Sequence, residues 1–245
     1  MADAPILLTG AHRSGTTWVG QTLARAPGIA YIHEPFRLQH RPGVCNITVD
    51  KWYTYICDQN NQQFYDPVKA MLEFSYNVGA ELAVLKTFDD FARMMRDLVR
   101  ITYLRLLNPQ PLVKNPFTLF SDEWFVDNFD AAVLLMVRHP AAFVSSILKK
   151  GWDFPFDHWL SQDKLLNDYL SPFVPEIRPY AQTSQALIDQ AILIWRVTHH
   201  VISKYRDSHS SWVICRHEDI SRDPLHSFVS LFEQFELEWG KGVER

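Results

Sequence analysis

Residues 9–18 of the chain read Thr-Gly-Ala-His-Arg-Ser-Gly-Thr-Thr-Trp, and this stretch decides the fold. It follows a short apolar run, Pro5 to Leu8, and it leads into a helix-like stretch from Trp18 to Arg25. A strand, a glycine loop and a helix N-terminus in this order bind phosphate, because free backbone N–H groups and the positive end of the helix dipole point into the loop. The sequence therefore predicts a phosphate-binding loop.

The loop has the spacing of a P-loop, G-x-x-x-x-G, between Gly10 and Gly15, with Thr17 in the hydroxyl position. Thr16, however, stands where an ATP-binding loop carries its lysine. A basic residue comes earlier instead, at Arg13. We do not expect a loop without this lysine to handle the β- and γ-phosphates of a nucleoside triphosphate.

The bulk composition is ordinary for a soluble globular protein, with 47% hydrophobic and 21% charged residues among 245. The formal net charge of −4 argues against general binding to nucleic acids or membrane surfaces. Any anion site must therefore be a local concentration of basic residues.

Cysteine usage and the absence of targeting segments favour a reducing compartment. The three cysteines form no C-x-x-C pair, so neither a disulfide framework nor a zinc site is suggested. We expect no metal. No signal peptide and no membrane-length apolar run are recognised, so we expect a cytoplasmic protein. A lumenal catalytic domain whose anchor lies outside this sequence would look the same.

Short apolar runs alternate with longer helix-like stretches, which is typical of βαβ units and a parallel sheet. We predict an α/β fold, P-loop-like and three-layered, with a central parallel sheet of about five strands flanked by helices. The candidate strands are Ile6–Thr9, Ile29–Ile32, Leu82–Lys86, Leu112–Lys114, Ala132–Val137 and Trp212–Arg216. The candidate helices are Thr16–Arg25, Asp89–Leu107, Pro140–Lys149, Gln185–Tyr205 and Pro224–Phe235.

Two segments interrupt the alternation, near residues 33–79 and 151–183, and both are rich in aromatic residues. Long irregular segments in compact domains usually serve as functional loops or lids. The alternative is that their aromatic side chains only seal the loops onto the core. We therefore predict one domain over residues 1–245, with these two segments as insertions that bind the acceptor.

Basic residues follow the candidate strands at Lys86, Lys114, Arg138 and Arg216. Ligands of open parallel sheets bind at the carboxyl ends of the strands. Together with Arg13 these cations predict a site for a polyanionic ligand. The alternative is pairing with nearby carboxylates, such as Glu218 and Asp219 beside Arg216.

Arg138 also argues against metal-dependent triphosphate chemistry. A P-loop ATPase needs an aspartate at the end of an apolar strand to hold Mg²⁺, and the best apolar strand here ends in Arg138. A P-loop kinase or NTPase remains the first alternative function, although the lysine of the loop and the aspartate at the strand end are both missing. Ser146 follows eight residues after Arg138, about two turns into a helix, and the two side chains could hold a second phosphate.

These motifs resemble the PAPS-dependent sulfotransferase family, and most closely its carbohydrate and tyrosylprotein branches. Residues 12–18 are similar to the family's 5′-phosphosulfate loop, and residues 137–146 resemble its 3′-phosphate motif. Residues 216–220 resemble its Arg-Tyr-Glu-Asp-Leu segment, with His217 in place of tyrosine. Residues 113–116 look like the Lys-x-Pro of the two branches, and Glu34 sits where those branches place a carboxylate base.

The resemblance implies transfer of a sulfuryl group from PAPS to a hydroxyl or amine, with PAP as the other product and no metal. It implies catalytic roles for Glu34 as base and for Arg13 and Lys114 as stabilisers of developing charge. His33 and His12 are rival bases, and an ion pair with Arg37 or Arg13 is the alternative role for Glu34. The implied cofactor-binding residues are Arg13, Ser14, Gly15, Thr16, Thr17, Trp18, Arg138, Ser146 and Arg216.

Two departures from the family pattern support a second alternative, a non-catalytic module that binds PAP or another nucleotide. His217 replaces a tyrosine, and the chain ends at residue 245, sooner than the family pattern leads one to expect. The expected partner is a small-molecule or carbohydrate acceptor, and a peptide acceptor is also compatible. Nucleic acid is not expected, and the sequence leaves the oligomeric state open.

Overall fold

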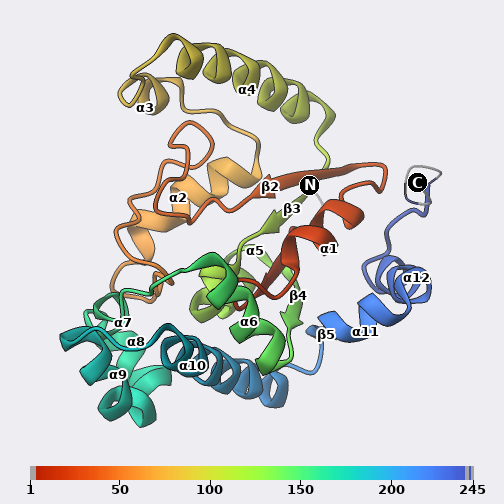
Figure 1. Cartoon of the computed structure of the whole chain (residues 1–245). Helices are drawn as coiled ribbons and strands as arrows, with labels where there is room; N and C mark the ends of the chain where they lie inside the picture. The colour runs from red at the N-terminus through yellow and green to blue at the C-terminus, as the bar shows by residue number, and fades with distance from the viewer. Residues whose placement is uncertain (1–3, 241–242, 244–245) are drawn as a thin grey trace.

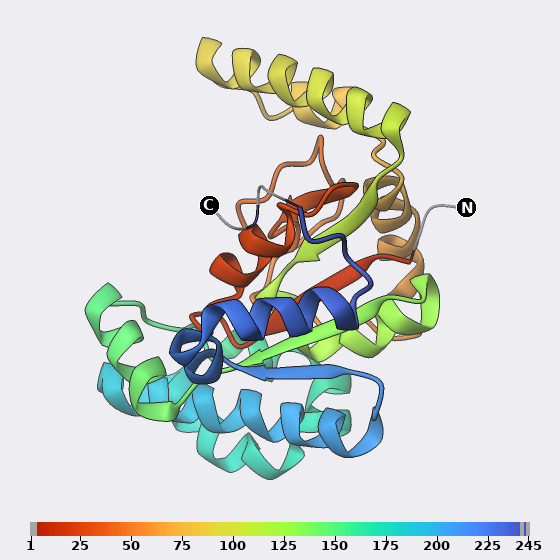
Figure 2. The same ribbon diagram turned by 90° about the vertical axis from the view of Figure 1, so that its right-hand side faces the viewer.

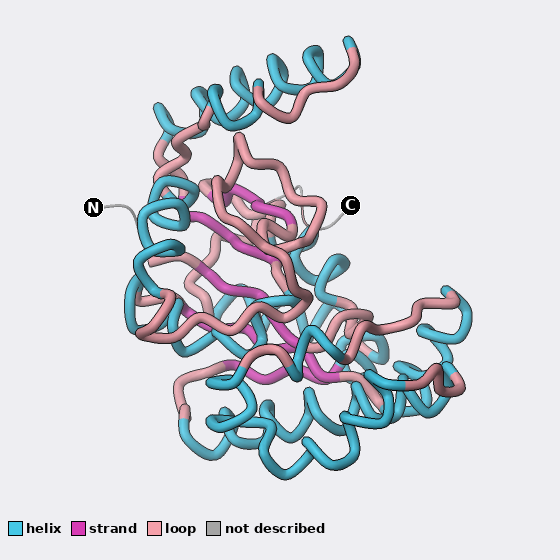
Figure 3. Tube along the Cα trace, turned by 90° about the vertical axis from the view of Figure 1, so that its left-hand side faces the viewer, coloured by secondary structure: helices cyan, strands magenta, loops and turns pink. Residues whose placement is uncertain are grey.

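The computed structural model describes residues 4–240 and 243, so the ends of the predicted 1–245 domain lie outside the described residues. A five-stranded parallel sheet lies at its centre, in the order β2-β3-β1-β4-β5 (Figures 1 and 3). The strands are β1 (Ile6–Gly10), β2 (Ile29–His33), β3 (Gln110–Lys114), β4 (Ala132–Val137) and β5 (Val213–Arg216). The predicted α/β fold with a parallel sheet is confirmed.

Side-chain alternation along β1 divides the core into two layers. Ile6 and Leu8 are fully buried on one face, where they pack with residues of α1 (Thr16–Leu23) and α12 (Pro224–Gln234). Figure 2 shows α12 lying across this face of the sheet. Leu7 packs on the opposite face, against α2 (Asn61–Leu72) and α5 (Asp122–Phe129). Burial on both faces explains why β1 reads as a continuous apolar run rather than an alternating one.

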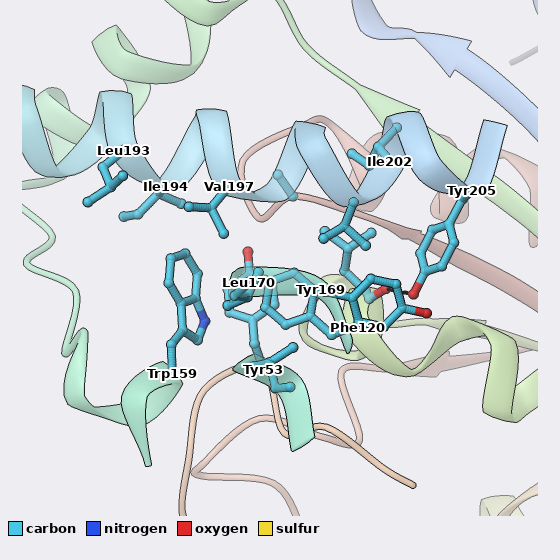
Figure 4. Close-up of a cluster of buried hydrophobic side chains, with 14 of the residues drawn as sticks. Tyr53, Phe120, Trp159, Tyr169, Leu170, Leu193, Ile194, Val197, Ile202 and Tyr205 are labelled. Atoms are coloured by element: carbon cyan, nitrogen blue, oxygen red, sulfur yellow. Dashed lines mark hydrogen bonds between the residues drawn. The ribbon is translucent and has the colours of Figure 1, made fainter. Parts of the chain in front are cut away.

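The largest core cluster lies on the same side of the sheet as α6 (Pro140–Lys150) and α10 (Leu187–Ser208). Apolar residues recur along α10 at Ile194, Val197 and Val201, the spacing of one helical face. Figure 4 shows this face packed over Trp159 and Tyr53, which come from the two insertion segments. The insertions therefore supply core residues as well as surface loops.

The other helices complete the covering layers. The predicted helices are confirmed to within about three residues at each end, and α4 (Phe88–Leu107) was expected from Asp89. The remaining short helices are α3 (Val78–Leu82), η1 (Pro116–Ser121), α7 (Asp157–Leu160), α8 (Asp163–Leu165), η2 (Leu166–Leu170), η3 (Ser171–Phe173), α9 (Val174–Gln182) and α11 (His217–Arg222).

The predicted strand Leu82–Lys86 is wrong. Leu82 ends the short helix α3, whose start is capped by the Asn77 side chain accepting from the Ala80 N–H at 2.9 Å. Residues 83–86 form a turn, and both Leu82 and Val84 are about half exposed. A short apolar run does not by itself separate a strand from a surface helix, and here the local cap decided. Lys86 therefore does not join the basic residues at the sheet edge.

The two insertion segments are more helical than predicted. The first contains α2 and the start of α3, and the second contains α7, α8 and α9 together with η2 and η3. Between α3 and β3 runs the long helix α4, which Figure 1 shows at the top of the molecule beside α3 and away from the sheet.

The sheet order places a crevice between β1 and β4. The chain leaves β1 through α1 toward β2 on one side, and it leaves β4 through α6 toward β5 on the other. The two helices cover opposite faces of the sheet. Such a switch point is where open parallel sheets bind their ligands. The glycine loop that follows β1 lies at this point.

Candidate functional site

The loop after β1 makes two turns that require backbone angles favoured by glycine. Gly10 has φ of 130°, and Gly15, the N-cap of α1, has φ of 90°. Between them the Ser14 N–H donates to the Ala11 carbonyl at 3.2 Å, and Arg13 also adopts positive φ. The N-cap has no side chain to satisfy the first amides of α1. These amides and the helix dipole are therefore available to an anion.

His217 closes the loop from the other side of the crevice. A Cβ atom added at Gly15 would lie 2.3 Å from His217 Nδ1, so only glycine fits here. The His217 ring meets the Trp18 ring edge-on at 5.8 Å between centroids. Burial and the nearby Arg138 charge lower the pKa of His217 against the opposing effect of Glu218. His217 Nδ1 is buried and makes no hydrogen bond to the described residues.

Arg13, Arg138 and Ser146 meet in one cluster. Arg138 Nη1 donates to the Arg13 carbonyl at 2.6 Å, and Arg13 Nε donates to Ser146 Oγ at 2.9 Å. The Arg138 carbonyl in turn accepts from Trp195 Nε1 at 2.9 Å. Burial lowers the pKa of Arg138, although Glu218 opposes the shift. Arg138 and Ser146, which were predicted to hold one phosphate together, are thus linked through Arg13.

Lys114 and Glu34 form an ion pair at the ends of β3 and β2. The Glu34 N–H donates to the Lys114 carbonyl at 2.8 Å, and Glu34 adopts positive φ, which turns its side chain back toward the strand end. The Lys114 ammonium, on a side chain that is almost fully buried, donates to Glu34 Oε1. Burial lowers the pKa of Lys114, and Glu34 opposes the shift. The other carboxylate oxygen, Oε2, lies 3.8 Å from His33 Nε2.

The predicted alternative for Glu34, a pair with Arg37 or Arg13, is replaced by the pair with Lys114. Both charges of the Glu34–Lys114 pair lie at the edge of the sheet where β2 and β3 end. The sequence did not suggest this pairing, because Glu34 and Lys114 are 80 positions apart in the chain.

His12 is held as a neutral ring. Its Nδ1 lies 2.6 Å from the Tyr53 hydroxyl, and its ring packs against Phe117 and Phe143. Burial, with a smaller contribution from the Arg13 charge, lowers the pKa of His12 to about 4. His12 therefore carries no charge near neutral pH, and one of its ring nitrogens is already engaged.

The buried His12 ring makes stability depend on pH. Its pKa is about 4 in the folded protein and 6.5 as its ordinary value, so between these values the unfolded chain binds more protons. The contribution of His12 to the free energy of unfolding is fully present above pH 6.5, and it is lost as the pH drops toward 4. We expect His12→Gln to remove about 1 to 3 kcal/mol of this pH-dependent loss, measured by urea unfolding at several pH values. The exposed His226→Gln variant is the control and should keep the parent slope.

A cavity of about 960 Å³ joins these groups. Its wall includes the predicted residues Arg13, Gly15, Thr16, Thr17, Trp18, Glu34, Lys114 and Arg138. Ser14 lies beneath the loop, buried, with a hydroxyl that has no hydrogen-bond partner among the described residues.

Arg216 and Ser146 are not part of this wall. The Arg216 side chain is 62% exposed and lies 3.8 Å from the Asp219 carboxylate, as the alternative of carboxylate pairing predicted. Ser146 reaches the site only through Arg13.

Sequence reasoning did not assign several residues of the wall. Arg37, Gln39 and Trp52 come from the first insertion, and Trp152 and Asp153 come from the second. The Arg13 guanidinium lies over the Trp152 ring, 5.3 Å from its centroid. The aromatic residues of the two insertions were the available signal, but the sequence did not say which rings face the cavity.

Two features are absent from the part of the chain that the structure describes. No helix there is long and apolar enough to cross a membrane. No group of three or more His, Cys, Asp or Glu side chains is arranged there to hold a metal ion.

Comparison of the sequence with protein-family profiles and with curated proteins finds no match. Comparison of the fold finds solved sulfotransferases. A sulfotransferase domain from the curacin biosynthetic pathway aligns with 99% of this chain and 77% of its own, at TM-score 0.50 and 12% identity. A sulfotransferase from Mycobacterium avium aligns with 100% of this chain and 66% of its own, at TM-score 0.50 and 13% identity. The protein described here therefore has the fold of the sulfotransferases.

Proposed function

We propose that this protein is a PAPS-dependent sulfotransferase that transfers a sulfuryl group to a hydroxyl or amine. The observation that carries the proposal is a set of polar groups left without partners around one loop. Ser14 Oγ, Arg138 Nε and His217 Nδ1 are buried and make no hydrogen bond to the described residues. Buried polar groups in folded proteins are usually paired, so these three support a ligand in contact with the loop, and the Arg138 charge favours an anion.

The groups fit a nucleotide with phosphates at two separate places. The amides at the start of α1, with the Thr16 and Thr17 hydroxyls, would hold the 5′-phosphosulfate of PAPS. Arg138 and Ser146, which lie beside the loop rather than in it, would hold the 3′-phosphate. Arg13 belongs to the loop and bonds both Ser146 and Arg138, and its charge would stabilise the phosphate as it leaves. The solved proteins that share this fold are sulfotransferases, which supports the proposal.

Glu34 is the base in this proposal. Its Oε1 accepts from the Lys114 ammonium, and Oε2, which Lys114 does not bond, would accept the proton of the acceptor. PAPS, when bound, supplies the sulfuryl group that the acceptor atom takes. Lys114 would place a positive charge beside the sulfuryl oxygens. The rival base His12 is less suited, because its Nδ1 already bonds Tyr53.

The acceptor would enter from a second cavity of about 380 Å³. This cavity shares Glu34, Arg37 and Gln39 with the larger one, so the proposed base lies where the two meet. Its remaining wall combines apolar residues such as Phe74 with charged residues such as Arg100. That mixture suits a partly apolar acceptor of the carbohydrate or phenolic kind.

Calorimetric titration with PAP tests the nucleotide site without knowledge of the acceptor. We expect micromolar binding by the parent protein, and at least about a tenfold loss in Arg138→Ala, since a charged hydrogen bond contributes about 1.5 to 3 kcal/mol. Arg216→Ala is the matched control, because Arg216 follows a neighbouring strand but lies outside the cavity wall. It should bind PAP as the parent does.

The same titration separates the alternatives. Tight, Mg²⁺-dependent ATP binding would overturn the proposal in favour of a P-loop kinase or NTPase. PAP binding without transfer to any member of an acceptor panel would indicate a non-catalytic module. Equal PAP affinity in the parent and in Arg138→Ala would contradict the proposed two-phosphate site.

A further inference from the structure

The outer face of α4 is apolar and exposed, although α4 is one of the longest helices of the protein. Met94 is the single fully buried residue of α4, all of which lies within the described residues. Figure 2 shows α4 projecting past the rest of the chain at the top of the view. Helices are stabilised mainly by packing of an apolar face, and the outward side of this long helix has no packing partner among the described residues.

The inner face of α4 packs Ile101 and Leu104 against the core and adds polar contacts. Asp97 pairs with Arg41, which also pairs with the buried Glu81. The Arg100 side chain donates to the Tyr31 carbonyl of the edge strand β2 at 3.1 Å. These contacts fix which side of the helix faces the body, and they leave the opposite side outward.

The outward side carries six large apolar residues at helical spacing. Phe88 and Leu106, at its two ends, are about 80% exposed. Positions 88 and 106 are 18 residues apart, which is about five helical turns, so they lie on the same line along the helix. The full stripe is Phe88, Phe91, Met95, Val99, Tyr103 and Leu106.

The stripe is symmetric about Asp97. Reversal of the helix about this residue exchanges Phe88 with Leu106, Phe91 with Tyr103 and Met95 with Val99. An antiparallel copy of the same helix therefore presents an apolar residue at every level of the stripe. A two-fold symmetric interface requires such self-complementarity.

The charges along α4 favour the same arrangement. The first half of the helix, residues 88–97, carries three aspartates and two arginines, whereas the second half, residues 98–107, carries two arginines and no carboxylate. Antiparallel pairing places the acidic end of one helix beside the basic end of the other, and the two helix dipoles also run in opposite directions. Parallel pairing would place like charges together.

We propose that α4 pairs with α4 of a second copy of this chain in an antiparallel arrangement. The two-fold axis lies at the level of Asp97 along the helix, on the outward side between Met95 and Val99. The pair covers the exposed stripe of both copies. It also supports one wall of the smaller cavity, because Asp97, Arg100 and Leu104 of α4 line that cavity from the inner side. The chain in solution is then a dimer of twice 28.5 kDa.

Sedimentation equilibrium of the full chain tests this dimer. Val99→Glu places two charges near the axis, and we expect it to raise the dimer dissociation constant by more than about a hundredfold, because each buried unpaired charge costs several kcal/mol. Leu225→Glu on α12 is the matched control, since Leu225 and Val99 are both 66% exposed. Leu225→Glu should stay dimeric, and circular dichroism should show both variants folded.

Cysteine cross-linking tests the direction of the pair. In an antiparallel pair position 88 of one copy lies level with position 106 of the other, whereas two copies of position 88 are about 27 Å apart. We expect a mixture of Phe88→Cys and Leu106→Cys proteins to form a disulfide-linked heterodimer, and neither protein alone to do so. The parent chain, with Cys45, Cys57 and Cys215, gives the background.

Three results would overturn the proposal. The first is a parent protein that stays monomeric up to about 100 µM, a concentration at which even a weak specific dimer would be populated. The second is a Val99→Glu protein that dimerises like the parent. The third is a monomer that binds vesicles containing phosphatidylserine, which would make the stripe a membrane-binding face instead.

Discussion

Glu34→Gln is expected to lower the turnover number by about 10²–10⁴, the usual effect of removing a general base. Glutamine keeps an oxygen that can accept from the Lys114 ammonium, so the local hydrogen bond survives while the basic oxygen is lost. Since Glu34 lies outside the loop that would hold the nucleotide, PAP affinity should change by less than about threefold, under 1 kcal/mol. The measurement is transfer from radiolabelled PAPS to whichever acceptor the panel identifies.

His33→Gln is the matched control for this prediction. His33 precedes Glu34 in the chain, and its Nε2 lies 3.8 Å from Glu34 Oε2. It should therefore lose far less activity than Glu34→Gln. A larger loss in His33→Gln, with Glu34→Gln still active, would transfer the base role to the histidine. That outcome would leave the nucleotide site as proposed.

Gly10→Ala is expected to destabilise the protein by about 3 to 5 kcal/mol, the sum of backbone strain and overpacking. Gly10 has φ of 130°, and an added Cβ would lie 2.3 Å from the Met136 carbonyl oxygen. That oxygen belongs to the neighbouring strand β4, so moving it away from the added Cβ would disturb the sheet. Urea unfolding measures the effect as a change in the free energy of unfolding.

Gly28→Ala separates the two causes. Gly28 also has positive φ, at 78°, but nothing lies within 4 Å of its added Cβ. It should lose only the strain contribution, about 1 kcal/mol. Equal losses in the two variants would show that the close approach of β4 does not contribute.

Much of the fold was readable because it rests on local patterns. The apolar run of β1, the glycine spacing after it and the start of α1 follow one another in the chain, and each is fixed by nearby backbone chemistry. The same holds for α6, where Pro140 occupies the first turn. The predicted strand at Leu82–Lys86 was wrong because the Asn77 side chain caps a short helix there and its apolar residues Leu82 and Val84 are half exposed.

The candidate site was readable in its residues but not in its pairings. Lys114 and Glu34 were assigned separately, since each follows its own strand, and parallel pairing of β2 with β3 brought their side chains together. Arg13 was expected to contact the leaving phosphate. Its hydrogen bond to Ser146 was not predicted, because the two residues are 133 positions apart in the chain. The cavity wall contributed by Trp52 and Trp152 was visible only as aromatic composition.

The glycine loop after β1, the parallel sheet and the basic residues at the ends of β3, β4 and β5 could be predicted from the sequence alone, because these depend on spacing within a few residues. Which charges meet, which rings face the cavity and which side of α4 stays outside became visible only in the folded chain. Those depend on contacts between distant segments, and a spacing rule within one segment carries no information about them.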